Sequence, residues 1–320
     1  MRGGVGSNAA EVPDAAELNE SMRRVLLRSR SIVEGLRSGM HPSPVVGHGG
    51  EFSAHRRYVR GDDPRRINWK VYSRHRQLFV KQFDTETNLN VHLVIDASGS
   101  MSCRTGVHPD KYEYAAAVAM AIAVVALGQR DSVGLTLVAD GGVVDHVGPR
   151  GDDGQHGALL AMVRRGRRIV DVGADGGGSG PGVAEAKPAG VAAAIAGSAG
   201  LSGRRGVVVV LSDWIDDVAA IHQCLAPFRD RGHDGYAIQL LDPMELTLDA
   251  AGRFRVEDPE SSATVTTHFD SVRKAYRDRV TRWIESVRHA AAEARMDHRV
   301  VTTDTPAASW LAEIFHSAAR

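Results

Sequence analysis

The feature that most limits the fold of this chain is an alternation, from residue 89 onward, of short apolar runs with longer helical patterns. Five apolar runs resemble strands, and they cover residues 90–96, 132–140, 206–213, 235–242 and 298–304. Patterns with helical spacing lie between or after them, at residues 110–128, 154–165, 183–198, 217–230, 268–295 and 306–318. This alternation predicts a doubly wound α/β fold with a mostly parallel sheet that is covered on both faces.

The chain before residue 89 has a different character. Apolar residues recur at helical spacing between Leu18 and Leu36 and predict an N-terminal helix. Residues 51–83 are dense in arginine and form a basic elaboration before the first core strand. We therefore divide the chain into a disordered tail (1–14), the N-terminal helix with the arginine-rich segment (15–88), and the α/β domain (89–320), which includes a small hairpin near 246–260.

Charge and cysteine content exclude several classes of protein. Lysine plus arginine number 39, as do aspartate plus glutamate, so no bulk attraction to nucleic acid or to a membrane is expected. The two cysteines, Cys103 and Cys224, support neither a disulfide framework nor a thiolate zinc site, and a reducing compartment fits them best. The N-terminus lacks the apolar core of a signal peptide, and the longest apolar run, 115–127, is shorter than the ~20 residues of a membrane span. We expect a cytoplasmic protein without a membrane span.

Polar side chains at two strand ends are the candidate site. The first apolar run ends at Asp96, with Ser98 and Ser100 just beyond it, and a later run ends at Asp213. In an open parallel sheet, ligands collect beyond the carboxyl ends of the strands, where the strand order reverses. Two hydroxyls and two carboxylates make an all-oxygen set, which suits Mg²⁺ or Mn²⁺.

The same residues have a simpler interpretation. Aspartate and serine are common turn and cap residues after a strand, and such a short pattern also arises by chance. The context favours metal binding, because the pattern ends a strongly apolar strand, a helix follows it, and Asp213 ends a second strand.

Two linked motifs resemble known families. Asp-Ala-Ser-Gly-Ser at 96–100 resembles the metal-ion-dependent adhesion site of von Willebrand factor A domains. The arginine-rich segment resembles the signature of a MoxR-associated bacterial family, domain of unknown function 58, which reads R-x-Y-x-x-G-D-D-x-R-x-I-D-W followed by an arginine. The matching residues here are Arg57 (or Arg56), Tyr58, Gly61, Asp62, Asp63, Arg65, Ile67, Trp69 and Arg74.

The resemblance implies a von Willebrand factor A-like fold and a role for each site residue. Ser98 and Ser100 would bind the ion through their hydroxyls, and Asp96 and Asp213 would act directly or through water. Two departures stand out. Asn68 replaces the usual aspartate before Trp69, and the usual threonine is missing between residues 172 and 200, where Ser179 is the one hydroxyl of the glycine-rich loop. The implied partners are a MoxR-type AAA+ ATPase and an unidentified protein client.

The arginine-rich segment allows two interpretations. Its arginines and aromatic residues could form a nucleic-acid surface of phosphate contacts and stacking platforms. Asp62 and Asp63 lie within the run, however, and arginine–aspartate pairs are well suited to internal bidentate bonding. We favour this structural interpretation, in which Tyr58 and Trp69 are packing residues and no nucleic acid is bound.

The motifs of several enzyme classes are missing. A haloacid dehalogenase-type phosphatase needs a second aspartate where this chain has Ser98. The sequence contains no phosphate-binding loop, no G-x-S-x-G elbow and no HExxH pair. We expect a non-enzymatic, metal-dependent interaction module. The alternatives are a hydrolase or nuclease that uses the same ion to activate water, and a degenerate scaffold without metal.

Overall fold

The computed structural model describes residues 20–39, 52–58, 69, 71–72, 77–83, 89–139, 141–174, 190–249, 252–257 and 264–318. The chain divides into two units, one formed by residues 1–41 with 89–320 and the other by residues 42–88. The larger unit contains the sheet and the candidate site.

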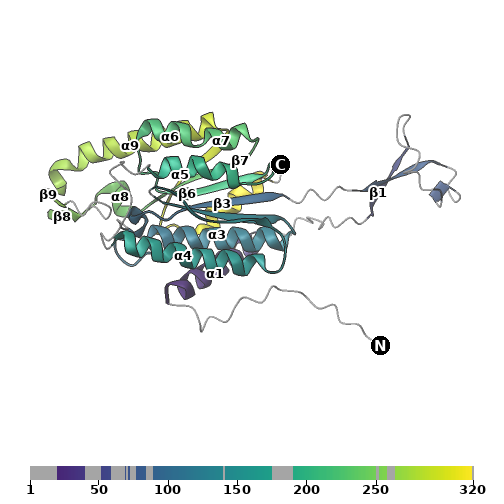
Figure 1. Ribbon diagram of the computed structural model, residues 1–320, viewed down its shortest axis with the longest axis horizontal. Helices are drawn as coiled ribbons and strands as arrows, with labels where there is room; N and C mark the ends of the chain where they lie inside the picture. The colour runs from purple at the N-terminus through teal and green to yellow at the C-terminus, as the bar shows by residue number, and fades with distance from the viewer. Residues whose placement is uncertain are drawn as a thin grey trace. The chain divides into compact units, whose positions relative to one another are not determined.

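A six-stranded sheet forms the centre of the larger unit (Figure 1). Its strands are β3 (Asn90–Asp96), β4 (Ser132–Ala139), β5 (Gly142–Arg150), β6 (Val207–Ser212), β7 (Asp234–Leu241) and β10 (Met296–Thr302). They lie in the order β10-β7-β6-β3-β4-β5, and only β5 is antiparallel to its neighbour. Numbered along the chain, this is the 3-2-1-4-5-6 order of doubly wound sheets, which reverses between β3 and β6. The predicted fold class is confirmed.

Helices cover both faces of the sheet, as Figure 1 shows. Alternate strand residues point to opposite faces, so that Leu93 and Ile95 enter one buried cluster and Val94 enters the other. The first face carries α1 (Glu20–Gly39), α3 (Lys111–Gly128), α4 (Gln155–Ala174) and α10 (Ala307–Ala318). The second carries α5 (Val191–Ser198), α6 (Val218–Cys224), α7 (Ala226–Asp230) and α9 (Phe269–Glu293).

Helix α3 is apolar because it is the core helix. By length and composition it is the one helix among the described residues that could cross a membrane, yet 78% of it is buried inside the unit. Asp110 begins the helix by accepting a hydrogen bond from the backbone N–H of Glu113 (2.7 Å). Its alanines allow it to lie close to the sheet, and it also packs against α1 and α4.

The predicted N-terminal helix exists as α1 and belongs to the larger unit. Its apolar side chains, including Met22 and Leu36, join the same buried cluster as α3 and α10. Arg24 and Arg28 donate from Nε to the carboxylate of Glu113 on α3, at 3.0 and 2.9 Å. The structure therefore groups this helix with the sheet, whereas the sequence-based division placed it with the arginine-rich segment.

Several element bounds differ from the prediction. The sixth strand, β5, is missing from it, because this strand is only half buried and lacks a strong apolar pattern. The helix expected over 217–230 is two helices, α6 and α7, which meet at Leu225 just before Pro227. Pro227, in the first turn of α7, has no backbone N–H for the carbonyl four residues earlier, and its ring clashes with that carbonyl, which explains the break.

The hairpin predicted near 246–260 is wrong in position. The antiparallel pair is β8 (Arg253–Glu257) with β9 (Thr264–His268). Residues 246 and 247, at the start of the predicted range, instead form the end of helix α8 (Pro243–Thr247). Asp242 and Glu245 form a capping box at the N-terminus of this helix. The capping box and the proline at the first helical position favour a helix at residues 243–247, so the first strand of the hairpin begins only after it.

The smaller unit contains β1 (Phe52–Arg57) paired antiparallel with β2 (Phe79–Phe83). The pairing continues past the strands, since Tyr58 N–H donates to the carbonyl of Leu78 (2.9 Å). Trp69 is exposed within this unit and contacts Tyr72 edge to face, and its predicted role as a packing residue stays a prediction. The other signature residues Gly61, Asp62, Asp63, Arg65 and Arg74 lie outside the described residues.

A buried histidine in β3 predicts acid sensitivity. The ring of His92 contacts the hydroxyl of Thr136 (Nε2 to Oγ1, 3.0 Å), and burial, helped by His146 and His233, lowers the pKa of His92 to about 3. The unfolded chain therefore binds more protons than the folded chain below about pH 6.5. We expect the free energy of unfolding to fall as the pH drops from 6.5 toward 3, by at most about 1.4 kcal/mol per pH unit from this group.

Urea unfolding at pH 7 and at pH 5 measures this effect, with His92→Gln as the comparison. The glutamine amide can still donate to Thr136 but does not titrate, so the variant should lose less stability between the two pH values. Equal losses in both proteins would contradict the assignment of acid sensitivity to His92.

Candidate functional site

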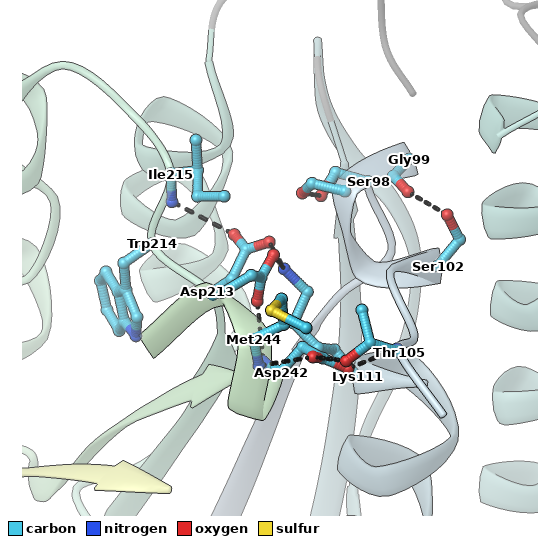
Figure 2. A network of polar contacts seen from close by, with 12 residues as sticks. Ser98, Gly99, Ser102, Thr105, Lys111, Asp213, Trp214, Ile215, Asp242 and Met244 are labelled. Atoms are coloured by element: carbon cyan, nitrogen blue, oxygen red, sulfur yellow. Dashed lines mark hydrogen bonds and ion pairs between the residues drawn. The ribbon is translucent and has the colours of Figure 1, made fainter. Parts of the chain in front are cut away.

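The structure places the two predicted carboxylates at the point where the strand order reverses. Asp96 is the last residue of β3, and Asp213 follows β6, the strand beside it. Both side chains are buried. We call this edge of the sheet, with the loops that follow β3 and β6 and the start of α3, the crevice (Figure 2).

The turn after β3 brings the two predicted hydroxyls together. Ser98 N–H donates to Asp96 Oδ1 (2.9 Å), and the Oγ atoms of Ser98 and Ser100 lie 3.0 Å apart. Ser102 plays a different part, because its hydroxyl donates to the carbonyl of Gly99 inside the 3₁₀ turn η3 (Gly99–Ser102) at 2.7 Å. Neighbouring ligands of an octahedral Mg²⁺ with bonds of 2.0–2.1 Å lie about 2.8–3.0 Å apart. The spacing of Ser98 and Ser100 fits that geometry.

Asp96 is held from both sides in an environment that disfavours its charge. Ser98 N–H binds one carboxylate oxygen, and the hydroxyl of Ser212 donates to the other (2.6 Å). Burial, followed by the nearby charge of Asp213, raises the pKa of Asp96 to about 7, against the opposing effect of these hydrogen bonds. A cation in the crevice would favour the ionised form.

Asp213 has a cationic partner that the sequence analysis missed. The side chain of Lys111, at the first position of α3, is 0% exposed, and its Nζ lies 2.8 Å from Asp213 Oδ2 and 2.8 Å from Glu245 Oε1 (Figure 2). Burial alone would lower the pKa of Lys111, but the two carboxylates outweigh it and raise the pKa above its usual value. The crevice therefore already contains one fixed positive charge.

A sequence signal for Lys111 exists. A lysine at the start of an otherwise apolar helix faces the positive end of the helix dipole, where cations are unfavourable. Such a residue requires an anionic partner, and Asp213 and Glu245 supply it.

The end of β7 contributes a third carboxylate. Asp242 accepts hydrogen bonds from the backbone N–H of Thr105 (2.7 Å) and of Met244 (2.9 Å), and its carboxylate also binds the Thr105 hydroxyl. Glu245 divides its oxygens between Lys111 and the N–H of Asp242 (2.8 Å). The start of α8 is thus tied to Lys111 and to the loop after β3.

The loop after β6 is held in one conformation. Trp214 is buried with φ = +62°, in the left-handed region that costs energy for a residue with a side chain. Its N–H donates to Ser212 Oγ (2.9 Å), its indole donates to the carbonyl of Ile238 (3.2 Å), and its own carbonyl accepts from Trp283 of α9 (2.9 Å). The tight turn lets Ile215 N–H donate to Asp213 Oδ1 (3.2 Å). These contacts fix the direction of Asp213.

The donor set fits a hard divalent cation in chemistry and in the spacing of its hydroxyls. Ser98 and Ser100 are the residues that would hold it, with Asp96 and Asp213 nearby. Lys111 opposes it, because the ammonium already balances part of the charge of Asp213. Ser179, our weaker candidate for the missing threonine position, lies outside the described residues.

The two cysteines do not extend the site to thiolate chemistry. Burial, followed by nearby carboxylates, raises the pKa of both Cys103 and Cys224 to about 12. At neutral pH both remain thiols, which are poor nucleophiles and poor metal ligands.

The sheet order and the oxygen-rich crevice at its reversal point define a doubly wound α/β protein with a mostly parallel sheet. Residues 54–286 match the family described as Protein of unknown function DUF58, and the chain belongs to this family. The resemblance of the arginine-rich segment to this family is thereby confirmed.

Individual similar proteins carry little functional information. Uncharacterized proteins of Mycobacterium tuberculosis and Mycobacterium bovis are 29% identical over 287 residues, which is 89% of this chain and 81% of theirs. Similar solved structures include the conserved hypothetical protein BatB from Bacteroides thetaiotaomicron, with 12% identity, a TM-score of 0.44, and coverage of 72% of this chain and 98% of that one. An aerotolerance-related membrane protein from Bacteroides fragilis gives 15% identity, a TM-score of 0.42, and coverage of 72% and 97%.

Proposed function

We propose that this chain is a non-enzymatic protein–protein interaction module whose crevice binds Mg²⁺ or Mn²⁺. In this proposal it acts with a MoxR-type AAA+ ATPase in the assembly or activation of other complexes. The observation that carries the metal-binding part is the pair of hydroxyls of Ser98 and Ser100, 3.0 Å apart beside two buried carboxylates. The ATPase partner rests on the family's signature residues.

The neutral hydroxyls suit a contact with a partner protein. Ser98 and Ser100 would contribute no charge of their own, and Asp213 is shared with Lys111. A bound divalent ion would therefore keep part of its positive charge and supply an electrophilic centre for a carboxylate of the partner. Binding would then require both the metal and an acidic residue, and a chelator would abolish it.

The loops around the crevice carry exposed apolar side chains. Val107, between η3 and α3, is 92% exposed, and Ile215 and Val218 in the segment after β6 are exposed as well. Protein interfaces commonly combine apolar contacts with a few well-placed polar groups. Apolar side chains beside a polar centre therefore support an interaction surface more than a small-molecule pocket.

The hydrogen-bond partners of the crevice residues support a non-enzymatic role. In the part of the chain that the structure describes, Asp96 and Asp213 are bound by Ser98, Ser212, Lys111 and Ile215. The Ser98 hydroxyl contacts the Ser100 hydroxyl and the Asp96 carboxylate, and among the described residues it contacts no histidine that could remove its proton. A hydrolase, the alternative, would turn over a generic phosphoester with Mg²⁺ or Mn²⁺, and we expect no such turnover.

Calorimetric titration of Mg²⁺ and then Mn²⁺ into chelator-treated protein tests the proposal. We expect saturable binding by the parent and its loss in Ser98→Ala/Ser100→Ala, because both hydroxyl ligands are gone. Ser102→Ala is the matched control, since its hydroxyl binds only inside the same turn. Binding that survives in the double variant would show that the metal lies elsewhere, and no binding by the parent would favour the metal-free scaffold.

A further inference from the structure

A second group of possible metal ligands lies on the helices of the other face, away from the oxygen-rich crevice. It consists of His222 on α6 and of His289 and Glu293 on α9, and one ligand atom from each lies within 4.8 Å of the other two. We propose that these three residues form a binding site for a transition metal ion such as Zn²⁺. The proposal is independent of the function proposed for the crevice.

Helix geometry brings the three side chains together. His289 and Glu293 are four residues apart on α9, so they lie on the same face one turn apart. Helix α6 packs against α9 and presents His222 to that face. The two imidazole rings meet edge to face with their centroids 5.3 Å apart. The site therefore bridges two helices that are distant from each other in the chain.

The ligand atoms lie close enough together to share one metal ion. Glu293 Oε2 lies 3.5 Å from His222 Nδ1, and Glu293 Oε1 lies 3.3 Å from His289 Nε2. Zinc bonds of 2.0–2.1 Å place neighbouring ligand atoms of a tetrahedron about 3.3–3.4 Å apart. Both distances are also longer than an ordinary N–H···O hydrogen bond of about 2.9 Å. The carboxylate thus lies between the two imidazoles with a different oxygen toward each, and a small rotation of its side chain would bring one oxygen into a site shared with both.

The ligand types narrow the choice of metal. Two imidazoles and one carboxylate suit Zn²⁺ and related transition metals, whereas Mg²⁺ prefers oxygen ligands throughout. Three protein ligands leave a fourth position for water or for a side chain of a partner. This metal preference separates the site from the all-oxygen crevice in a titration.

Such a site would fasten the loop that carries Asp213. At one attachment, the loop runs from β6 into α6, and Asp217 caps the first turn of that helix. At the other, α9 holds the loop through the hydrogen bond that Trp283 donates to the carbonyl of Trp214. An ion shared by His222 and His289 would hold both helices in place, and with them both attachments of the loop.

The experiment is a titration of metal-free protein with Zn²⁺, followed by Co²⁺ as a spectroscopic probe. We expect the parent to bind one Zn²⁺. His289→Ala and Glu293→Gln should each lower the Zn²⁺ affinity by more than roughly 10- to 100-fold, which is the loss expected when a residue that only supports a ligand is removed. Co²⁺ in the parent should show the intense visible absorption of a four-coordinate ion, which both variants should lack. His268→Ala is the control, because this exposed histidine lies at the opposite end of α9.

His289 and Glu293 are exposed, so their replacement should leave the fold intact, and circular dichroism checks this directly. Hydrogen exchange at residues 213–218 gives a second measurement, with slower exchange expected in the parent when Zn²⁺ is present. The proposal is wrong if the parent binds Zn²⁺ no more tightly than the two variants, or if His268→Ala loses binding to the same extent. A six-coordinate Co²⁺ spectrum that both variants retain would place the ion at another site and would equally overturn it.

Discussion

Replacing Lys111 by methionine should lower the free energy of unfolding by about 3–5 kcal/mol. Methionine matches the length of the lysine stem but removes the ammonium that lies 2.8 Å from both Asp213 and Glu245. Asp213 would then be a buried carboxylate without its cationic partner, which is the costly way to break a buried ion pair. Urea unfolding at neutral pH measures the loss.

Two further variants separate this cause from a general effect of losing a lysine. Lys274→Met changes an exposed lysine on α9 and should alter stability by no more than about 0.5 kcal/mol. Lys111→Met/Glu245→Gln also removes one of the two carboxylates that Lys111→Met leaves without a cationic partner. The double variant should therefore recover part of the lost free energy of unfolding. If Lys111→Met is as stable as the parent, the ion pair is not buried in solution and the description of the crevice is wrong.

The same variant tests the relation of Lys111 to the metal proposed for the crevice. Unit charges 4 Å apart interact by about 4 kcal/mol at an effective dielectric constant of 20, so removing the ammonium removes a strong repulsion. We expect Lys111→Met to bind Mg²⁺ about tenfold more tightly than the parent, or better. Unchanged affinity would mean that the ion binds away from Asp213.

Apolar patterning was sufficient to predict five of the six strands of the sheet. The runs that became β3, β4, β6 and β7 are buried along most of their length, and β10 is partly buried but carries Val300, Val301 and Thr302, so their sequence and their environment agree. Parallel strands end at the same edge of the sheet, which is why Asp96 and Asp213 could be paired from the sequence, and in the structure β6 lies beside β3. Metal binding at that point stays a prediction.

Features decided by long-range contacts were not predictable in this way. Strand β5 pairs with β4 at the edge of the sheet, where half-buried positions leave no clean alternation. Lys111 was missed because its two partners, Asp213 and Glu245, lie more than a hundred residues later in the chain. The hairpin was misplaced for a different, local reason. The capping box at Asp242 favours a helix over the weak strand pattern that follows it.

Trp214→Ala is the second substitution with a large expected effect, about 3–5 kcal/mol of unfolding free energy. The indole is almost fully buried in the cluster on the second face of the sheet, so its removal leaves a cavity. It also breaks the bond to the carbonyl of Ile238, which anchors the loop to β7. Because Asp213 precedes this residue, we also expect weaker Mg²⁺ binding at a urea concentration where the variant is still folded.

Trp214→Phe distinguishes packing from the hydrogen bond. Phenylalanine retains much of the ring but has no N–H for Ile238, so its stability should fall between those of the parent and Trp214→Ala. Trp214→Gly adds a test of the backbone, since glycine adopts φ = +62° without strain and should recover part of the loss seen with alanine. If glycine is instead the less stable of the two, the left-handed turn after Asp213 does not exist in solution, and the orientation of this carboxylate would need another explanation.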